Sequence, residues 1–470
     1  MAGLLSSTIR IPDLHQLPEL FPRHLAELRD RLHRGDKSVK PTIIKIKFEP
    51  NNGETIDQLT WLNCQKSLPK IAWYAREGDY AVAAIGKAQA HLAPQVNASG
   101  DLKAILDGLT DRDAAYLTWF GGVAFDPYLD VEMGWRSFGA YRFVAPQFYL
   151  ETEGDRQRFV VQTIAPEKIS PALDELLEAF AALHWDMTPA ELPLTQVLGR
   201  DEFPKHTHWL EIHEQAMQDI GSGTFDKVVL AKKEVLNLAS NLSTGAIFNQ
   251  LVHQNSKSYR FYFEFEPNCV FMGASPERLF LRQQHSLESE ALAATRPRGA
   301  SSPENVAMGQ ELMSSGKDRR EHQIVMNQLQ TRFQKLADTI QSDDSPGIVE
   351  TPFVQHLYQQ IRGTLKSEIG LGEILTTLHP TPALGGFPRS KALEAIRHYE
   401  DFSRGWFGGP VGWIRGNDAE FAVGIRSALI TDVRQIFLYA GVGIVTGSDA
   451  EMEWQEMRQK FQTITASLGL

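Results

Sequence analysis

The N-terminal part of the chain alternates short apolar segments with turns. Five segments between residues 41 and 165 are rich in β-branched or aromatic residues, which is typical of strands. They cover 42–48, 70–75, 80–86, 116–125 and 158–165. A stretch with helical character follows at 171–185. Residues 1–186 are therefore predicted to form a strand-rich N-terminal half.

Residues 187–201 break this pattern, because they are punctuated by prolines and show no clear period. We expect this segment to be a linker or crossover, followed by a mixed half over residues 202–470. That half contains an apolar strand at 228–231, and Lys227 lies directly before its first residue. A hairpin is predicted where the alternating segment RFYFEFE turns at Pro267 into CVFMGA.

Two predicted helices carry charged residues on or beside their apolar stripes. The first runs from about 317 to 340, and Glu321 lies one turn before the apolar residues that recur from Val325 onward. The second runs from about 450 to 466. The residues that share one face of it are Glu453, Met457, Lys460 and Ile464.

Four acids on these two helices form a candidate metal site, namely Asp318, Glu321, Glu453 and Glu456. Carboxylate oxygens suit Mg²⁺, which binds a few carboxylates together with waters and a substrate oxygen. The alternative is that these acids lie on solvated helix faces. The histidines are scattered and lack the His-Glu-x-x-His spacing, so no zinc site is expected.

Two later segments place small residues around possible ligand contacts. A predicted strand over 419–430 puts Arg426 among alanines and a glycine, which suits capture of a carboxylate; the alternative is an ordinary arginine on a solvated face. In the segment 437–447, Gly441 and Gly443 share one face. Their backbone would allow close approach of a small anion, or it could form a bulge or a tight contact between strands.

The composition narrows the class of protein. The chain has 470 residues, of which 42% are hydrophobic and 22% are charged, as in ordinary globular proteins. Its net charge of −11 repels the phosphate backbones of nucleic acids and anionic membrane surfaces. Neither a nucleic acid nor a membrane partner is therefore expected. Two cysteines supply no disulfide framework, and no apolar run has the length of a signal peptide or a membrane span. We therefore expect a cytoplasmic protein.

Eight segments resemble the chorismate-utilising enzymes, a family that includes isochorismate synthases, salicylate synthases, aminodeoxychorismate synthases and anthranilate synthase large subunits. In chain order they are DKVVLAK, FMGASPERLF, ESEALAATRPRG, SGKDRREHQIV, HPTPALGGFPR, FGGPVGW, FAVGIRSALI and YAGVGIVTGSDAEMEWQEMRQKF. The N-terminal half matches loosely, chiefly through WFGGVAFD at 119–126. The resemblance implies an α+β fold, a single large domain in which two similar halves contribute strands to a large antiparallel sheet enclosed by helices.

The resemblance also assigns the two catalytic groups. Lys227 would be the general base that activates water for attack at C2 of chorismate, and Glu277 would be the general acid that protonates the departing C4 hydroxyl. Attack and departure occur at different carbons, so one group must accept a proton while another donates one. Desolvation favours both roles, because it lowers the pKa of an amine and raises that of a carboxyl group.

The remaining predicted site residues follow from the same resemblance. Glu321 and Glu456 would bind Mg²⁺, with Asp318 and Glu453 close enough to hold metal-bound water. The groups expected to bind the substrate carboxylates are Arg426, the backbone of Gly441 and Gly443, and Lys460. Thr295 and His356 match further pocket positions.

Two positions narrow the expected reaction. In the family, a lysine at the position of Lys227 is typical of members that use water as the nucleophile. Ala383 stands where the pyruvate-eliminating members usually have threonine. Both favour reversible conversion of chorismate to isochorismate. We also expect that the protein has no glutaminase partner and is a monomer. The alternatives are a salicylate synthase, an aminodeoxychorismate synthase component, and a chorismate-binding protein without catalytic activity.

Overall fold

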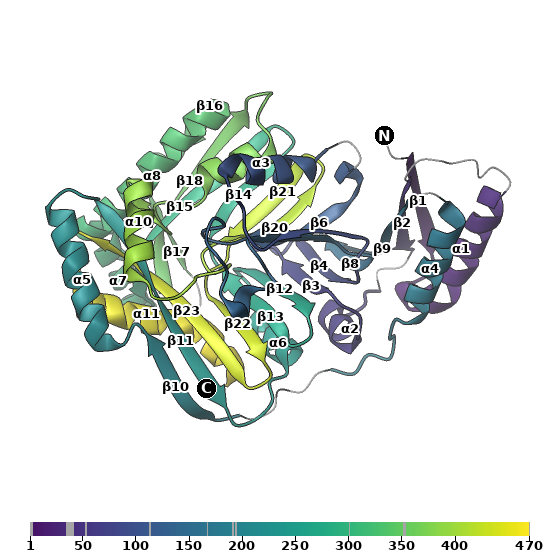
Figure 1. Cartoon of the computed structure of the whole chain (residues 1–470), viewed down its shortest axis with the longest axis horizontal. Helices are drawn as coiled ribbons and strands as arrows, with labels where there is room; N and C mark the ends of the chain where they lie inside the picture. Colours follow the sequence, from purple (N-terminus) through teal and green to yellow (C-terminus); the bar gives the residue numbers. More distant parts are fainter. Residues whose placement is uncertain are drawn as a thin grey trace.

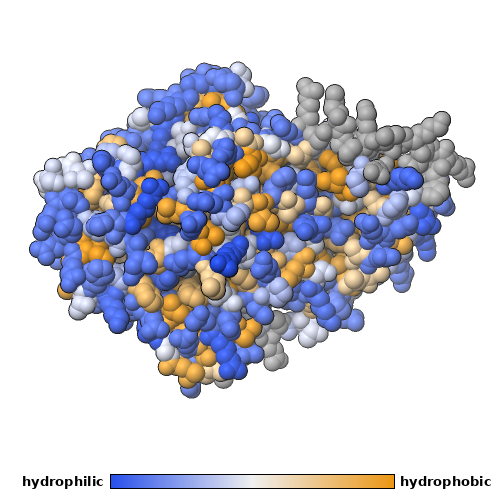
Figure 2. All heavy atoms as spheres, in the orientation of Figure 1, coloured by the Kyte–Doolittle hydropathy of each residue, from blue (hydrophilic) through white to orange (hydrophobic). Residues whose placement is uncertain are grey.

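The computed structural model of the chain shows an α+β protein whose strands form two large sheets (Figure 1). The structure describes residues 3–33, 42–51, 54–111, 114–166, 168–189, 192, 195–299, 301–350 and 354–469. No helix in these ranges is long and apolar enough to span a membrane. Figure 2 shows a face that is mostly hydrophilic, with apolar residues scattered across it.

Sheet A contains 13 strands in the described part of the chain. In spatial order they are β1 (Gly3–Ile11), β2 (Thr42–Pro50), β9 (Arg156–Ala165), β8 (Phe148–Glu153), β4 (Tyr80–Ile85), β3 (Lys70–Tyr74), β12 (Tyr259–Glu266), β13 (Cys269–Ser275), β22 (Ser427–Asp432), β23 (Gln435–Val445), β11 (Lys227–Leu238) and β10 (Val197–Phe203), with β19 (Gly386–Phe387) paired to β11. The pairs are antiparallel except β1 with β2, which is parallel.

Sheet B contains ten described strands. Its order is β16 (Ala337–Ser342), β18 (Val354–Leu365), β15 (Ser286–Pro297), β14 (Arg278–Gln283), β21 (Asp418–Val423), β20 (Pro410–Arg415), β6 (Thr118–Val123), β7 (Tyr141–Ala145) and β5 (Gln89–Ala93), with β17 (Gly347–Glu350) paired to β18. Both halves of the chain therefore contribute strands to both sheets.

The helices surround the sheets (Figure 1). They are α1 (Leu17–His33), α2 (Gln58–Cys64), α3 (Ser99–Gly108), α4 (Ile169–Ala181), α5 (His206–Gly221), α6 (Thr244–Gln254), α7 (Ser302–Ser314), α8 (Gly316–Leu336), α9 (Leu371–Leu378), α10 (Arg389–Tyr399) and α11 (Ala450–Thr465). Two of them position the site described below, because α8 packs against β15 and β18, and α11 packs against β23.

An aromatic core fills the space between the two sheets. Phe261, Phe263 and Phe265 of β12 lie in it, as their alternation predicts, and they pack with Trp406 and Phe271. All five side chains are at most 5% exposed. Rigid packing of this core fixes the relative placement of sheets A and B.

The predicted fold class is confirmed, and three details differ from the prediction. The strands divide between two sheets instead of one, because the chain crosses between sheets at several points. The last five residues of the predicted linker, 197–201, belong to β10, which pairs with β11, and its residues 190, 191, 193 and 194 lie outside the described residues. The first charged helix ends at Leu336, and Ile340 lies in β16, where it pairs with β18.

The predicted strand over 419–430 is wrong as a single element. It consists of β21 in sheet B and β22 in sheet A, separated by Gly424, Ile425 and Arg426. Arg426 adopts a left-handed φ of 51°. A Cβ at Gly424 would approach the carbonyl oxygen of Trp406 to 2.6 Å, so only glycine fits this crossing.

Candidate active site

A cavity lies where the chain passes between the two sheets, enclosed by α8 and α11. Twelve of the thirteen predicted site residues line it. They are Glu277, Thr295, Asp318, Glu321, His356, Ala383, Arg426, Gly441, Gly443, Glu453, Glu456 and Lys460. All the residues that line the cavity belong to the second half of the chain.

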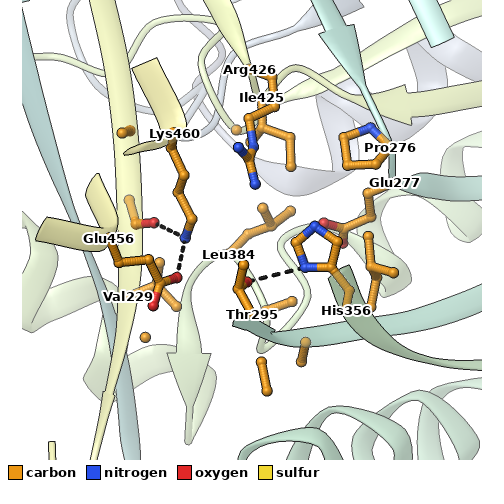
Figure 3. A pocket seen from close by; sticks show the side chains of 18 of the residues that line it. Val229, Pro276, Glu277, Thr295, His356, Leu384, Ile425, Arg426, Glu456 and Lys460 are labelled. Atoms are coloured by element: carbon orange, nitrogen blue, oxygen red, sulfur yellow. Dashed lines mark hydrogen bonds and ion pairs between the residues drawn. The ribbon is translucent and has the colours of Figure 1, made fainter. Parts of the chain in front are cut away.

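Two neighbouring crossings between the sheets position Glu277 and Arg426. Glu277 lies between β13 of sheet A and β14 of sheet B, and Arg426 lies between β21 of sheet B and β22 of sheet A. The two crossings are joined by backbone hydrogen bonds, from Val423 N to the Glu277 carbonyl (3.1 Å) and from Ala274 N to the Arg426 carbonyl (3.0 Å). Both side chains point into the cavity (Figure 3).

Glu277 is a buried carboxyl group with 4% of its surface exposed. Burial and the negative charge of Glu290 raise the pKa of Glu277 to about 8, although Lys227 and Lys460 act in the opposite direction. The carboxyl group is therefore protonated at neutral pH. It can donate a proton to a group bound in the cavity.

Lys227 begins β11 and is fully buried beside the cavity. Its Nζ lies 2.9 Å from Oε1 of Glu321. It also lies 3.2 Å from the position that a Cβ at Gly443 would occupy, so the amine reaches the cavity past a glycine that lines it. Burial acts to raise the pKa of Glu321, but the charge and hydrogen bond of Lys227 outweigh burial and lower it.

Each of the four predicted metal ligands is paired with a basic side chain. Besides Lys227 with Glu321, the pairs are Lys460 with Glu456 (2.7 Å), Lys317 with Glu453 (2.6 Å), and Arg296 with Asp318. Among the described residues, no three acidic, histidine or cysteine side chains are gathered as a metal site. The acids are nevertheless close to one another, since burial and then the charge of Glu456 raise the pKa of Glu453.

Arg426 supplies a positive charge to the centre of the cavity (Figure 3). Burial lowers the pKa of Arg426 to about 10, so the guanidinium is still charged at neutral pH. The described residues place no carboxylate within ion-pair distance of it. The group is therefore available for a bound carboxylate, and the alternative of a solvated arginine is wrong because Arg426 is only 7% exposed.

His356 and Thr295 form a neutral hydrogen-bonded pair on the cavity wall. The Thr295 hydroxyl and Nδ1 of His356 are 3.1 Å apart (Figure 3). Burial, then the charges of Arg426 and Lys460, lower the pKa of His356 to about 3. In the described part of the chain, its buried Nε2 has no hydrogen-bond partner, so it is free to contact a ligand.

The two glycines of β23 have different surroundings. The Gly441 carbonyl accepts a hydrogen bond of 2.7 Å from Lys460 Nζ, and a Cβ at Gly441 would meet its nearest neighbour at 3.3 Å. A Cβ at Gly443 would lie 2.5 Å from Oε1 of Glu321. Gly443 thus makes room for the Lys227–Glu321 pair.

Sequence reasoning missed several residues that line the cavity. Arg296 and Lys317 neutralise Asp318 and Glu453, and Leu384 and Tyr439 supply apolar wall. A usable signal was the position of Lys317 directly before Asp318 on a helix that carries acids beside its apolar stripe.

Comparison with known proteins assigns the chain to a family. A family profile described as "chorismate binding enzyme" matches residues 30–469. The chain belongs to the chorismate-binding enzyme family. Isochorismate synthase MenF of Escherichia coli is 32% identical over 412 residues, which cover 87% of this chain and 89% of that protein. Isochorismate synthase 2, chloroplastic, of Arabidopsis thaliana is 29% identical over 444 residues, 88% of this chain and 79% of that protein.

Solved structures of the chorismate-binding family agree with the fold. The structure of MenF, the menaquinone-specific isochorismate synthase from Escherichia coli, superposes with a TM-score of 0.83 at 28% identity and covers 95% of this chain and 99% of that one. Anthranilate synthase component I from Streptococcus pneumoniae, at 18% identity and a TM-score of 0.67, shares the fold. The resemblance drawn from the eight sequence segments is confirmed, whereas the monomeric state, the cytoplasmic location and the lack of a glutaminase partner stay predictions.

Proposed function

We propose that this chorismate-binding enzyme is an isochorismate synthase that interconverts chorismate and isochorismate. One observation carries the proposal: a buried amine and a protonated carboxyl group adjoin one cavity that also holds an arginine available for a carboxylate. The names of the similar proteins from Escherichia coli and Arabidopsis thaliana support the same activity.

The arrangement supports a reaction with separate acid and base. Arg426 and Lys460 would hold the carboxylates of chorismate, and Lys227, in its uncharged form, would take a proton from water as the water oxygen attacks C2. Glu277 would give its proton to the C4 hydroxyl, which leaves as water. One C–O bond forms, one breaks and the ring double bonds shift, so an isomer of the substrate results. In the reverse direction the acid and base exchange roles.

The carboxylates of α8 and α11 fit a hard divalent cation in their chemistry. Four acids face one cavity, and like charge within this set raises the pKa of Glu453 in addition to burial. Glu321 and Glu456 would hold Mg²⁺, which supplies positive charge beside the substrate carboxylate. To bind it, these acids must leave Lys227 and Lys460, their present partners.

The product formed from chorismate tests the proposed activity. Chromatography after incubation with chorismate and Mg²⁺ is expected to show isochorismate. Salicylate with pyruvate would instead indicate a salicylate synthase, and a product that requires ammonium would indicate an aminodeoxychorismate or anthranilate type of enzyme. Binding of chorismate without any product would identify a protein that is not an enzyme.

Removal of the metal tests the proposed cofactor. Chelation is expected to abolish turnover, and calorimetric titration with Mg²⁺ should show weaker binding to Glu321→Ala than to the wild type. Glu451→Ala is a matched control, because this exposed acid of α11 pairs with His206 away from the cavity. Equal Mg²⁺ affinity in the wild type and Glu321→Ala would exclude Glu321 as a ligand.

A further inference from the structure

Behind Glu277 lies a buried ion pair that does not line the active-site cavity. Glu290 of β15 receives two hydrogen bonds from Arg76, which follows β3: Nη1 to Oε1 at 2.7 Å and Nη2 to Oε2 at 2.9 Å. Its side chain is 1% exposed and that of Arg76 is 15% exposed. Burying such a pair is costly, so stability alone does not explain its presence.

The pair holds the backbone on both sides of Glu277. Nη1 of Arg76 also donates to the carbonyl of Pro276 at 2.8 Å, and Oε1 of Glu290 accepts from the backbone N–H of Arg278 at 2.8 Å. The residues directly before and after Glu277 are thus bound to one bidentate pair. Motion of the Glu277 side chain is limited accordingly, because its own N–H and carbonyl are also hydrogen-bonded, to Ser275 Oγ and Val423 N.

The pair also sets the charge around Glu277. Three charged groups act on this carboxyl group: Glu290 from β15, Lys227 from β11 and Lys460 from α11. Glu290 is the one negative charge among them, and it opposes ionisation of Glu277, whereas the two lysines favour it. Arg76 partly cancels the charge of Glu290 by contact.

We propose that Arg76 and Glu290 are positioning residues for the reaction, which fix the backbone on both sides of Glu277 and place a carboxylate behind its carboxyl group. The inference rests on the proposed role of Glu277 as the general acid. It predicts effects of opposite sign from the two members of one ion pair, which a merely structural pair would not produce.

The pH dependence of turnover tests the charge effect. A general acid must be protonated, so kcat falls as pH rises through the pKa of Glu277, near 8 in the wild type. This fall in kcat is the alkaline limb of the pH profile. In Glu290→Gln it is expected to move to lower pH by about one unit, because the negative charge of Glu290 no longer opposes ionisation of Glu277. In Arg76→Gln it is expected above the wild-type position, since the contact that partly cancels the charge of Glu290 is then lost.

The backbone restraint is tested by the rate at the optimum pH. Both variants are expected to lose about tenfold or more in kcat with little change in KM, because the proton donor is misplaced. Glu290→Asp keeps the charge, so its alkaline limb should stay at the wild-type position. Glu288→Gln is the matched control: this acid lies two residues away on β15, contacts Arg362 at 3.2 Å, approaches the Arg278 side chain only at 3.8 Å, and should leave the profile unchanged.

A measurement without catalysis separates this inference from the proposed function. The stability advantage of Glu277→Gln over its parent background in thermal unfolding grows from the unfolded pKa upward and stops growing at the folded pKa of Glu277, so the pH at which it levels off reports that folded pKa. That pH should shift down in Glu290→Gln even if the wild type makes no isochorismate, in which case only the proposed function fails. Two quantities are compared between Glu290→Gln and Arg76→Gln: the pH of the alkaline fall in kcat and the pH at which the stability difference levels off. If they move in the same direction in both variants, or do not move, the positioning role is overturned. If one variant does not fold, the other still decides by the direction of its shift.

Discussion

Glu277 and Lys227 are ionisable side chains that the fold keeps away from water, with exposed fractions of 4% and 0%. At the scale of the residue, their chemistry is set by neighbours that contact them. Burial and then the charge of Glu290 raise the pKa of Glu277, whereas Lys227 faces a carboxylate, Glu321. The same two amino acids at exposed positions would lack these contacts and this desolvation.

Replacing either group should remove most of the activity. Glu277→Gln and Lys227→Gln are each expected to lower kcat by about 10²–10⁴-fold, because a positioned acid or base contributes that much. Product chromatography measures the loss. Lys233→Gln is the control, since this lysine of the same strand contacts Glu132 away from the cavity. Rates near that of the wild type in either active-site variant would refute its assigned role.

The same Glu277→Gln variant should change stability with a definite sign. The folded pKa of Glu277, about 8, lies above its ordinary value of 4.5. The wild type therefore loses stability as pH rises from 4.5 through 8, and the amide does not. The difference in unfolding temperature between variant and wild type should grow in favour of the variant over this range.

Gly443 should be far less tolerant of a side chain than Gly441. In Gly443→Ala the new methyl group would overlap Oε1 of Glu321 and Cε of Lys227, at 2.5 and 2.8 Å. We expect a loss of about 1–3 kcal/mol in the free energy of unfolding, as for other overpacked sites. Gly441→Ala is the matched comparison, with its nearest contact at 3.3 Å. Equal destabilisation of the two variants in thermal unfolding would contradict this account.

At the scale of the element, α8 and α11 bring acids to the cavity and basic residues compensate them. Glu453 and Glu456 come from α11, and their partners Lys317 and Lys460 come from α8 and α11. Trp454, the next residue of α11, anchors the helix to sheet A, since its ring centroid lies 3.7 Å from Nζ of the buried Lys232 of β11. The helix is thus held against sheet A while it presents charge to the cavity.

Loss of one member of the Lys317–Glu453 pair should destabilise the joint between these helices. Lys317→Met leaves the buried Glu453 without its partner, and about 1–2 kcal/mol of unfolding free energy should be lost, since Lys317 is 29% exposed and solvent screens the pair. The double variant Lys317→Met/Glu453→Leu should recover most of the loss. Chemical denaturation of the three proteins measures it, and a double variant no more stable than Lys317→Met would show that charge compensation is not the cause.

At the scale of the whole molecule, the two halves of the chain meet through buried polar contacts as well as shared sheets. Nε2 of His379, before the loop that carries Ala383, contacts the carbonyl of Phe125 from the N-terminal half at 2.9 Å. Burial lowers the pKa of His379 to about 3. The neutral form of this imidazole is therefore part of the junction between the halves.

Buried neutral histidine should make the protein sensitive to acid. The folded pKa of His379 lies below its ordinary value of 6.5, so the stability it contributes is present above pH 6.5 and is lost as pH falls toward 3. His379→Gln keeps a donor for Phe125 and should lose less stability than the wild type between pH 6.5 and 4. The control is His398→Gln, at an exposed position of α10, which should follow the wild type. Parallel losses in all three proteins would contradict the prediction.

Local pattern determined which elements form, and the family resemblance of short segments gave the candidate site residues. The alternation in β12, the apolar strand that begins at Lys227 and the stripes of α8 and α11 depend on short-range periodicity, and they were predicted correctly. The motif residues identified by family resemblance lie at or beside one cavity.

Tertiary structure alone decided how these residues meet. The segment 419–430 reads as one strand, but the change from sheet B to sheet A breaks it at Gly424 and turns Arg426 into the cavity. The partners of the acids, and the Arg76–Glu290 pair behind Glu277, join residues up to 214 positions apart. Hydrogen bonds, charge and desolvation act through distances in space, which periodicity along the chain does not encode.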